Sequence, residues 1–138
     1  MPGFLLDTNV VSELRRARPH KGVVNWISTL AQDEIFVSAV SFGEIQRGVE
    51  ATRRTDAAKA REIESWLDAV VASFPVVAVD RDMFRECARL LHGRSRSDIE
   101  DAMIAATARI RRLTVATRNT RDFQFLKVPL FNPFGFKG

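Results

Sequence analysis

The sequence predicts an α/β fold in which a mostly parallel sheet lies between layers of helices. Short apolar runs, typical of buried strands, alternate with longer stretches in which apolar residues recur at helical spacing. The chain has 138 residues, of which 46% are hydrophobic, which is enough for one core but too little for two ordinary domains. We therefore expect a single domain over residues 1–138.

The first part of the chain predicts two strands and two helices. Phe4–Leu6 is a short apolar run that stops at Asp7, and a short helix follows around Val10. After a basic loop, apolar residues follow helical spacing over residues 23–30. Residues 35–37 are again apolar and predict the second strand.

The middle of the chain is predicted to be mostly helical. Ser41 lies three residues before Glu44, which is the spacing of a capping box, so we expect a helix to run from Ser41 to about Ala51. A longer amphipathic helix is expected over about 55–72, and Pro75 ends it.

The next segment returns to the strand and helix alternation. Residues 76–79 predict a third strand that ends at Asp80. Residues 82–91 carry apolar side chains at helical spacing, and Gly93 stops this helix.

The last segment predicts one more helix and two strands. Ser97 and Glu100 repeat the capping-box spacing, so an alanine-rich helix is expected over 98–110. A fourth strand is expected at 113–116, and a last short strand near 128–130.

Polar residues follow the predicted strands. Asp7 comes directly after the first strand, and Asn119 follows the strand at 113–116 after two further residues. Glu44 and Asp101 are expected near the starts of helices that face the same edge of the sheet. Ligands of open parallel sheets bind beyond the carboxyl ends of the strands, so this edge is the candidate site.

Each acidic residue also has an ordinary structural explanation. Asp7 suits the cap of the following helix, and Glu44 suits the reciprocal position of its own capping box. Asp98 and Asp101 complement a helix dipole, and Asp122 suits the cap of a turn. Taken singly, none of these residues identifies a functional site.

Taken together, the acids predict a cation. Residues 102–106 are small and apolar, so carboxylates that converge beside them would repel one another unless a cation lay between them. A set of oxygen ligands favours Mg²⁺ or Mn²⁺ over zinc. His20 and His92 are expected at the surface, and Cys87 is expected to be a packed core thiol.

The overall charge favours a phosphate-rich or acidic partner. The chain has 21 Lys and Arg against 17 Asp and Glu, a net charge of +4. No apolar run approaches the roughly 18 residues that a membrane span needs, and a single cysteine fits a reducing compartment. We expect a cytoplasmic protein without a membrane partner.

The chain resembles the PIN-domain ribonucleases, and within them the VapC and FitB-like toxins of bacterial toxin-antitoxin pairs. The resemblance rests on four blocks in the order of that family. They are residues 6–14 (LDTNVVSEL), 38–48 with Glu44 at their centre, 101–108 (DAMIAATA) and 117–123 (TRNTRDF).

The resemblance implies a PIN-like α/β/α sandwich and an endoribonuclease that uses Mg²⁺, for which Mn²⁺ substitutes, to cut single-stranded or structured RNA. It also implies a toxin that forms a homodimer, is neutralised by a small cognate antitoxin, and binds DNA only through that antitoxin.

The resemblance also assigns site residues. Asp7, Glu44 and Asp101 match the three acidic metal-site positions. The fourth position is occupied by an acid in many relatives, and here either Asn119 or Asp122 corresponds to it; we favour Asp122. The supporting positions match Thr8, Asn9 and Thr117. Arginines near the same edge are candidates for holding flanking phosphates, namely Arg94, Arg96, Arg118 and Arg121.

Two other functions compete with the ribonuclease. A phosphatase of the haloacid-dehalogenase type needs a second acid two residues after the first, and this chain has Asn9 there. The stronger rival is a non-catalytic partner in a DNA-binding toxin-antitoxin repressor complex. A metal-binding fold without catalysis is a third reading, against which the complete acidic set argues.

Overall fold

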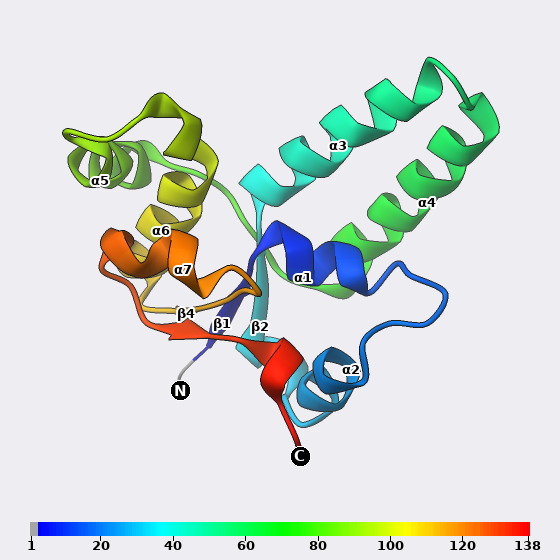
Figure 1. Cartoon of the computed structure of the whole chain (residues 1–138), viewed down its shortest axis with the longest axis horizontal. Coiled ribbons are helices and arrows are strands. Elements are labelled where there is room, and N and C mark those ends of the chain that lie inside the picture. The colour runs from blue at the N-terminus through cyan, green and yellow to red at the C-terminus, as the bar shows by residue number, and fades with distance from the viewer. Residues whose placement is uncertain (1–2) are drawn as a thin grey trace.

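Five short parallel strands form the centre of the molecule, which is described over residues 3–138 by a computed structural model (Figure 1). They are β1 (Phe4–Leu6), β2 (Ile35–Ser38), β3 (Val76–Val77), β4 (Thr114–Ala116) and β5 (Leu130–Phe131), in the spatial order β3-β2-β1-β4-β5. Every strand pair in this range is parallel, which confirms the predicted α/β sheet.

The order of the strands reverses between β1 and β4. From β1 the chain adds β2 and then β3 on one side, and it later returns to place β4 on the other side of β1. Phe4 consequently pairs with Ile35 on one side and with Thr114 on the other. The crevice at such a reversal, beyond the carboxyl ends of the strands, is where open α/β sheets bind ligands.

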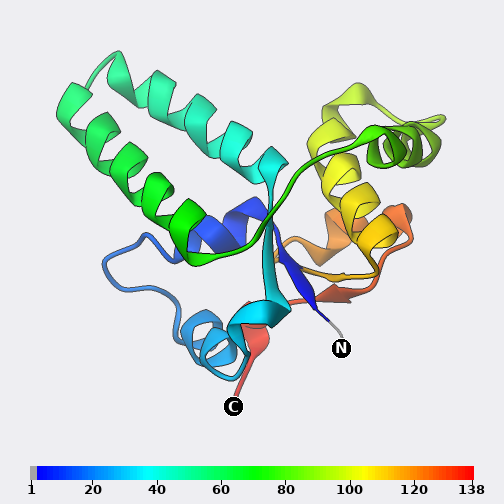
Figure 2. The ribbon, with the colours of Figure 1, turned by 180° about the vertical axis from the view of Figure 1, so that it is seen from behind.

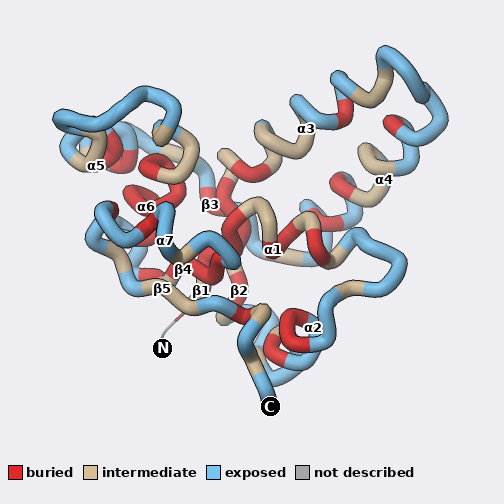
Figure 3. Tube along the Cα trace, viewed as in Figure 1, coloured by how far each residue is buried: buried red, intermediate tan, exposed pale blue. Residues whose placement is uncertain are grey.

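Helices cover both faces of the sheet. They are α1 (Thr8–Glu13), α2 (Lys21–Ser28), α3 (Ala39–Arg53), α4 (Ala57–Ser73), α5 (Arg81–Leu91), α6 (Ile99–Arg111) and α7 (Thr120–Phe123), with short 3-10 turns at Gln32–Glu34, Arg96–Asp98, Gln124–Leu126 and Pro133–Gly135. Leu5 and Val115 pack against α5 and α6, whereas Leu6 and Val37 pack against α1, α2 and α4. Successive strand residues thus face opposite layers, and the central strands β1, β2 and β4 are mostly buried (Figure 3).

The helix α6 is the most deeply buried of the helices. All residues from 102 to 108 are buried, and most of them are alanine, which lets the helix approach the sheet closely. Asp101 immediately precedes this stretch, so its position is fixed by the packing of the whole helix.

The helices α3 and α4 pair as a hairpin that projects away from the sheet (Figures 1 and 2). The predicted capping box at its start is wrong. Ser38 is the actual cap, with its hydroxyl accepting from the N–H of Val40 at 3.0 Å, and the helix extends to Arg53. Ser41 lies one turn farther on and is buried.

The second predicted capping box is also wrong. A 3-10 turn at Arg96–Asp98 precedes α6, and the hydroxyl of Ser97 lies 2.9 Å from that of Ser95 instead of capping the helix. Asp98 occupies the cap position of α6 without a side-chain hydrogen bond.

Strand bounds depend on pairing partners that local sequence does not reveal. The third strand is limited to Val76–Val77, where it pairs with β2. The last strand lies at Leu130–Phe131, slightly later than predicted, because β4 pairs with Leu130 through Val115. The short helix α7 was not predicted.

Three minor expectations can also be compared with the structure. Cys87 is buried, as predicted. His20 is exposed, and its Nδ1 accepts from the N–H of Gly22 at the start of α2. Among the helices of residues 3–138, none combines the length and apolar character that a membrane span requires.

The burial of α6 generates a stability prediction. Ile104 is fully buried, whereas Ile110 on the same helix is 40% exposed. We expect Ile104→Ala to lower the free energy of unfolding by about 2–5 kcal/mol, because it removes buried methyl groups and leaves a cavity. Ile110→Ala, the matched control, should cost less than about 1 kcal/mol. Urea unfolding measures both, and equal losses would contradict the assigned burial.

Candidate active site

The candidate site begins with Asp7, at the carboxyl end of the central strand. Asp7 follows β1 directly and caps α1, with Oδ1 accepting from the N–H of Thr8 at 2.8 Å. The residue is only 5% exposed. Asp7 therefore does cap the following helix, as the sequence suggested. The cap uses only Oδ1 and leaves the second carboxylate oxygen for other contacts.

Two neutral donors hold the other oxygen, Oδ2, of Asp7. The hydroxyl of Thr117 donates to it at 2.8 Å, and Nδ2 of Asn9 donates at 3.1 Å. Thr117 follows β4, so this bond joins the ends of two neighbouring strands. Asn9 Oδ1 accepts from the backbone N–H of Arg118 at 3.2 Å, and Thr117 Oγ1 accepts from that of Asn119 at 3.0 Å. These bonds fix Asp7 without neutralising it.

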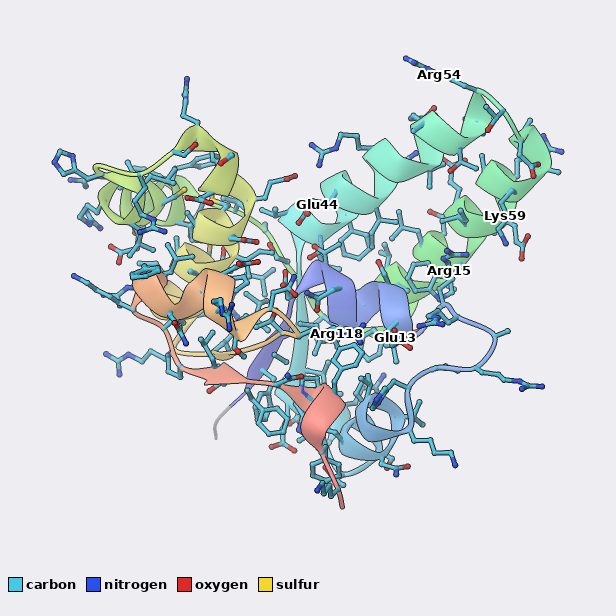
Figure 4. All side chains as sticks on the ribbon, viewed as in Figure 1. Glu13, Arg15, Glu44, Arg54, Lys59 and Arg118 are labelled. Carbon is cyan, nitrogen blue, oxygen red and sulfur yellow. The ribbon has the colours of Figure 1, made fainter. Side chains whose placement is uncertain are left out.

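Glu44 comes to the site from the first turns of α3 (Figure 4). The hydroxyl of Thr8 donates to Oε1 of Glu44 at 2.7 Å and lies 2.9 Å from Oγ of Ser41. Because a hydroxyl has a single proton, Ser41 is placed to donate to Thr8 in turn. Glu44 is thus tied to α1 and is not the partner of a capping box.

Asp101 carries the largest electrostatic perturbation. It lies in the first turn of α6, and its pKa is raised from 3.8 to about 7. Burial is the largest cause, and the negative charges of Asp7, Asp122 and Glu44 add to it. Each of the leading causes acts in the same direction and raises the pKa of Asp101.

The other two acids of the inner site are perturbed in the same direction. Burial raises the pKa of Asp7, and the charge of Asp122 raises it further, while the hydrogen bonds from Thr117 and Thr8 lower it. Burial also raises the pKa of Glu44, with Glu100 and Asp7 adding to the rise. Asp7 at the end of β1, Glu44 on α3 and Asp101 on α6 therefore carry unfavourable negative charge at this end of the sheet.

The two candidates for a fourth acidic position differ in how they relate to the others. Asp122 lies on α7 and is exposed, yet its charge raises the pKa of both Asp7 and Asp101. Asn119 is also exposed, and it joins the hydrogen-bond network through its backbone N–H to Thr117. Asp122 is thus linked to two of the acids through its charge, whereas Asn119 is linked to the site through a hydrogen bond.

The chemistry of these side chains fits a divalent cation. Every donor is an oxygen, the pKa values of Asp7, Glu44 and Asp101 are all raised, and none of Asp7, Glu44, Asp101 and Asp122 belongs to an ion pair within residues 3–138. Within residues 3–138, no three acidic, histidine or cysteine side chains lie close enough together to form a ready-made metal site. The case for a cation therefore rests on the oxygen donors and on the raised pKa values.

Sequence reasoning missed an ion pair at the mouth of the site. Arg47, one turn after Glu44 on α3, pairs at 3.2 Å with Glu100, which directly precedes Asp101 on α6. The pair therefore links the two helices that carry Glu44 and Asp101. Its members are 53 positions apart, so no local signal reveals the contact.

Two of the arginines proposed to hold phosphates lie over aromatic rings. Arg118 lies over the ring of Phe134 at 4.5 Å, and Arg94 lies over that of Phe125 at 4.8 Å. Arg118 directly follows Thr117, so its backbone is anchored at the site (Figure 4). Arg94 also pairs with Asp98 at 3.8 Å.

Comparison with known proteins gives a consistent result. A family model described as PIN domain matches residues 4–129. Toxin FitB of Neisseria gonorrhoeae is 34% identical, over 95% of this chain and 98% of its own. VapC ribonuclease Y4jK of Sinorhizobium fredii is 33% identical, over 95% of this chain and 97% of its own.

Solved structures agree with the sequence comparison. The structure of FitAB bound to an IR36 DNA fragment matches with a TM-score of 0.82 and 29% identity, covering 98% of each chain. Other solved structures of this fold include toxin-antitoxin complexes.

The raised pKa of Asp101 generates a pH prediction. In metal-free protein, only the folded state retains the Asp101 proton between about pH 4 and 7, so stability falls as the pH rises through this window. At pH 8 we expect Asp101→Asn to be more stable than wild type by an amount on the order of a few kcal/mol, and at pH 4 the gap should close. Millimolar Mg²⁺ should stabilise wild type at pH 8 more than the variant.

Thermal unfolding with EDTA or Mg²⁺ measures these differences. The matched control is Asp68→Asn, which removes an exposed carboxylate from α4. Parallel behaviour of the two variants at both pH values would contradict the electrostatic assignment of the site.

Proposed function

We propose, from the premise that this chain belongs to the PIN-domain family, that it is a divalent-metal-dependent endoribonuclease and the toxin of a toxin-antitoxin pair. The observation that carries the proposal is the set of mutually repelling carboxylates around Asp7, which is itself held by uncharged donors. Its relatives include a toxin and a VapC ribonuclease, and this chain spans nearly their whole length.

The cofactor is Mg²⁺, with Mn²⁺ as a substitute. Asp7 and Asp101 would hold the ion directly or through water, and Glu44 and Asp122 would complete its surroundings or hold a second ion. When bound, the cation lowers the pKa of a water molecule and neutralises charge on the scissile phosphate.

The residues of the chain have separate tasks in this reaction. Thr117 and Asn9 keep Asp7 in one orientation, and Thr8 does the same for Glu44. The reaction is hydrolysis: the oxygen of water bonds to phosphorus, the bond from phosphorus to the 3′ oxygen breaks, and that oxygen takes up a proton. The products carry a 5′-phosphate and a 3′-hydroxyl.

The proposal extends to the partners and to the organisation of the chain. The chain acts as one domain, forms a homodimer, works in the cytoplasm and is neutralised by a small cognate antitoxin. The DNA-bound FitAB structure supports a second role, in which the chain joins a promoter-binding complex and the antitoxin contacts the DNA. This role is compatible with catalysis, because the acidic residues are needed for RNA cleavage and not for membership of the DNA-binding complex.

The first prediction of this proposal concerns cleavage. Purified protein should cut a single-stranded RNA panel with Mg²⁺ or Mn²⁺ but not with EDTA. Asp7→Asn and Asp101→Asn should each lose at least about 100-fold in kcat/KM, because each removes a charged ligand. Asp68→Asn should cut like wild type. Metal-independent cleavage, or equal cleavage by all variants, would refute the proposed chemistry.

The second prediction separates the two candidates for the fourth position. If Asp122 helps to hold the cation, Asp122→Asn raises the Mg²⁺ concentration required for half-maximal cleavage by about tenfold, whereas Asn119→Ala changes it less. Metal titration of the cleavage rate measures both variants. The reverse ranking would assign the position to Asn119.

A further inference from the structure

Two adjoining hollows extend from the candidate site along one side of the molecule. The first, of about 360 Å³, includes Thr8 and Glu44 in its lining and runs between α1, α3 and α4. The second, of about 380 Å³, continues toward the loop after α1 and the outer part of α4. Arg15 and Ile63 line both hollows, so the two hollows adjoin, and we call them together the α1–α4 groove.

Basic side chains line the length of this groove. Arg47 and Arg15 line the first hollow, and Arg15 and Lys59 line the second. Figure 4 labels Arg15 and Lys59. Arg47 pairs with Glu100 at 3.2 Å, and Lys59 pairs with Glu62 at 3.7 Å. Exposed pairs of this kind contribute little to stability, so a phosphate can replace either carboxylate.

The rest of the lining suits a polynucleotide. Ser12 and Thr52 supply hydroxyl groups to the first hollow, and the half-buried Trp66 lines the second, where a base can stack on it. Gly48 lines the first hollow, and a Cβ built on it would meet no atom within 4 Å. The absence of a side chain at this point keeps the path open beside Glu44.

Another hollow on the α3–α4 hairpin provides a contrast. It lies between the hairpin and β3 and is lined mostly by apolar residues, including Phe42, Leu67 and Val71. No Lys or Arg of the described chain lines it, and neither Asp7 nor Glu44 does. Its chemistry suits a protein surface, whereas the α1–α4 groove combines cations with direct access to the candidate site.

We propose that the α1–α4 groove binds the RNA strand that flanks the scissile phosphate. Arg15, Arg47 and Lys59 hold backbone phosphates in it, and Trp66 stacks on a base. The groove thus extends substrate recognition beyond the acidic site, and neither Arg94 nor Arg118 lines it. This inference rests on the proposed ribonuclease function and specifies where that substrate lies.

Cleavage of two substrates tests the groove. One is a dinucleotide, which occupies only the candidate site, and the other is a longer single-stranded oligonucleotide. The measured quantity is the ratio of kcat/KM for the long RNA to that for the dinucleotide. Arg15→Gln combined with Lys59→Gln should reduce this ratio by about tenfold, and Gly48→Gln should reduce it by filling the path.

Matched controls come from the same hairpin. Arg54→Gln removes a cation at the outer end of α3 that lines neither hollow, and Gly43→Gln adds the same side chain to α3 where a Cβ also meets no atom within 4 Å. Both should keep the wild-type ratio. Melting temperatures of the two glycine variants should equal or exceed that of wild type, which separates a blocked path from a damaged fold.

Binding provides a readout that does not depend on catalysis. Fluorescence anisotropy of the labelled long RNA is measured with Asp101→Asn protein, alone and combined with the groove substitutions, over a range of salt concentrations. Substitution of Arg15 and Lys59 should weaken RNA binding. It should also reduce the magnitude of the slope of log K against log salt concentration by about 0.7 for each cation removed.

The outcomes distinguish failure of the groove from failure of the proposed function. If wild type cuts both RNAs, and the groove variants keep the wild-type kcat/KM ratio of long RNA to dinucleotide and the wild-type RNA affinity, the groove proposal is overturned. The proposed nuclease activity is then supported. If wild type cuts neither RNA but the groove substitutions weaken RNA binding, the proposed nuclease activity is refuted and the proposed RNA-binding groove is supported. If RNA does not bind at all, or if Gly48→Gln only prevents capture of a co-expressed antitoxin, the RNA groove is wrong.

Discussion

The hydrogen bond from Thr117 to Asp7 is the contact on which the rest of the site depends. It joins the ends of β1 and β4 at the point where the strand order reverses, and Asn9 reinforces it on the same carboxylate oxygen. Both donors are uncharged. An arginine in their place would hold Asp7 equally well but would neutralise it, and the carboxylate would then attract a cation much less strongly. Neutral donors therefore fix the geometry and preserve the charge.

The helices α6 and α3 position the other two acids, Asp101 and Glu44, also without a charged partner. The buried alanine-rich face of α6 fixes the position of Asp101, and the contact of Thr8 with Glu44 ties α3 to α1. Each acid reaches the site from a different element, so the core must hold them close against their repulsion. The raised pKa of Asp101 measures that cost, which a bound cation would offset. Binding of the metal and stability of this end of the sheet are consequently coupled.

The basic residues are distributed differently from the acids. Acidic groups of the site are buried or half-buried at the sheet, with only Asp122 exposed, whereas Arg15, Arg47 and Lys59 lie on the outer surface of the hairpin side. This arrangement suits a polyanionic RNA strand. The acids alone would repel the strand, whereas the basic side chains on the surface attract it over a long range. A divalent cation at the site and the basic side chains along the groove would both offset the repulsion between the acids and a polyanionic strand.

The sequence by itself determined the α/β class, the positions of most strands and helices, and the place of Asp7 at the end of a strand, because these follow from local apolar periodicity and from polar residues at strand ends. It misassigned Ser41 and Ser97 as helix caps, since capping-box spacing also occurs where a serine makes other contacts. Only the tertiary structure decided that Thr117 contacts Asp7, 110 positions away, and that Arg15 and Lys59 line one groove. Such contacts depend on strand order and helix packing, which bring together residues whose local sequences carry no information about each other.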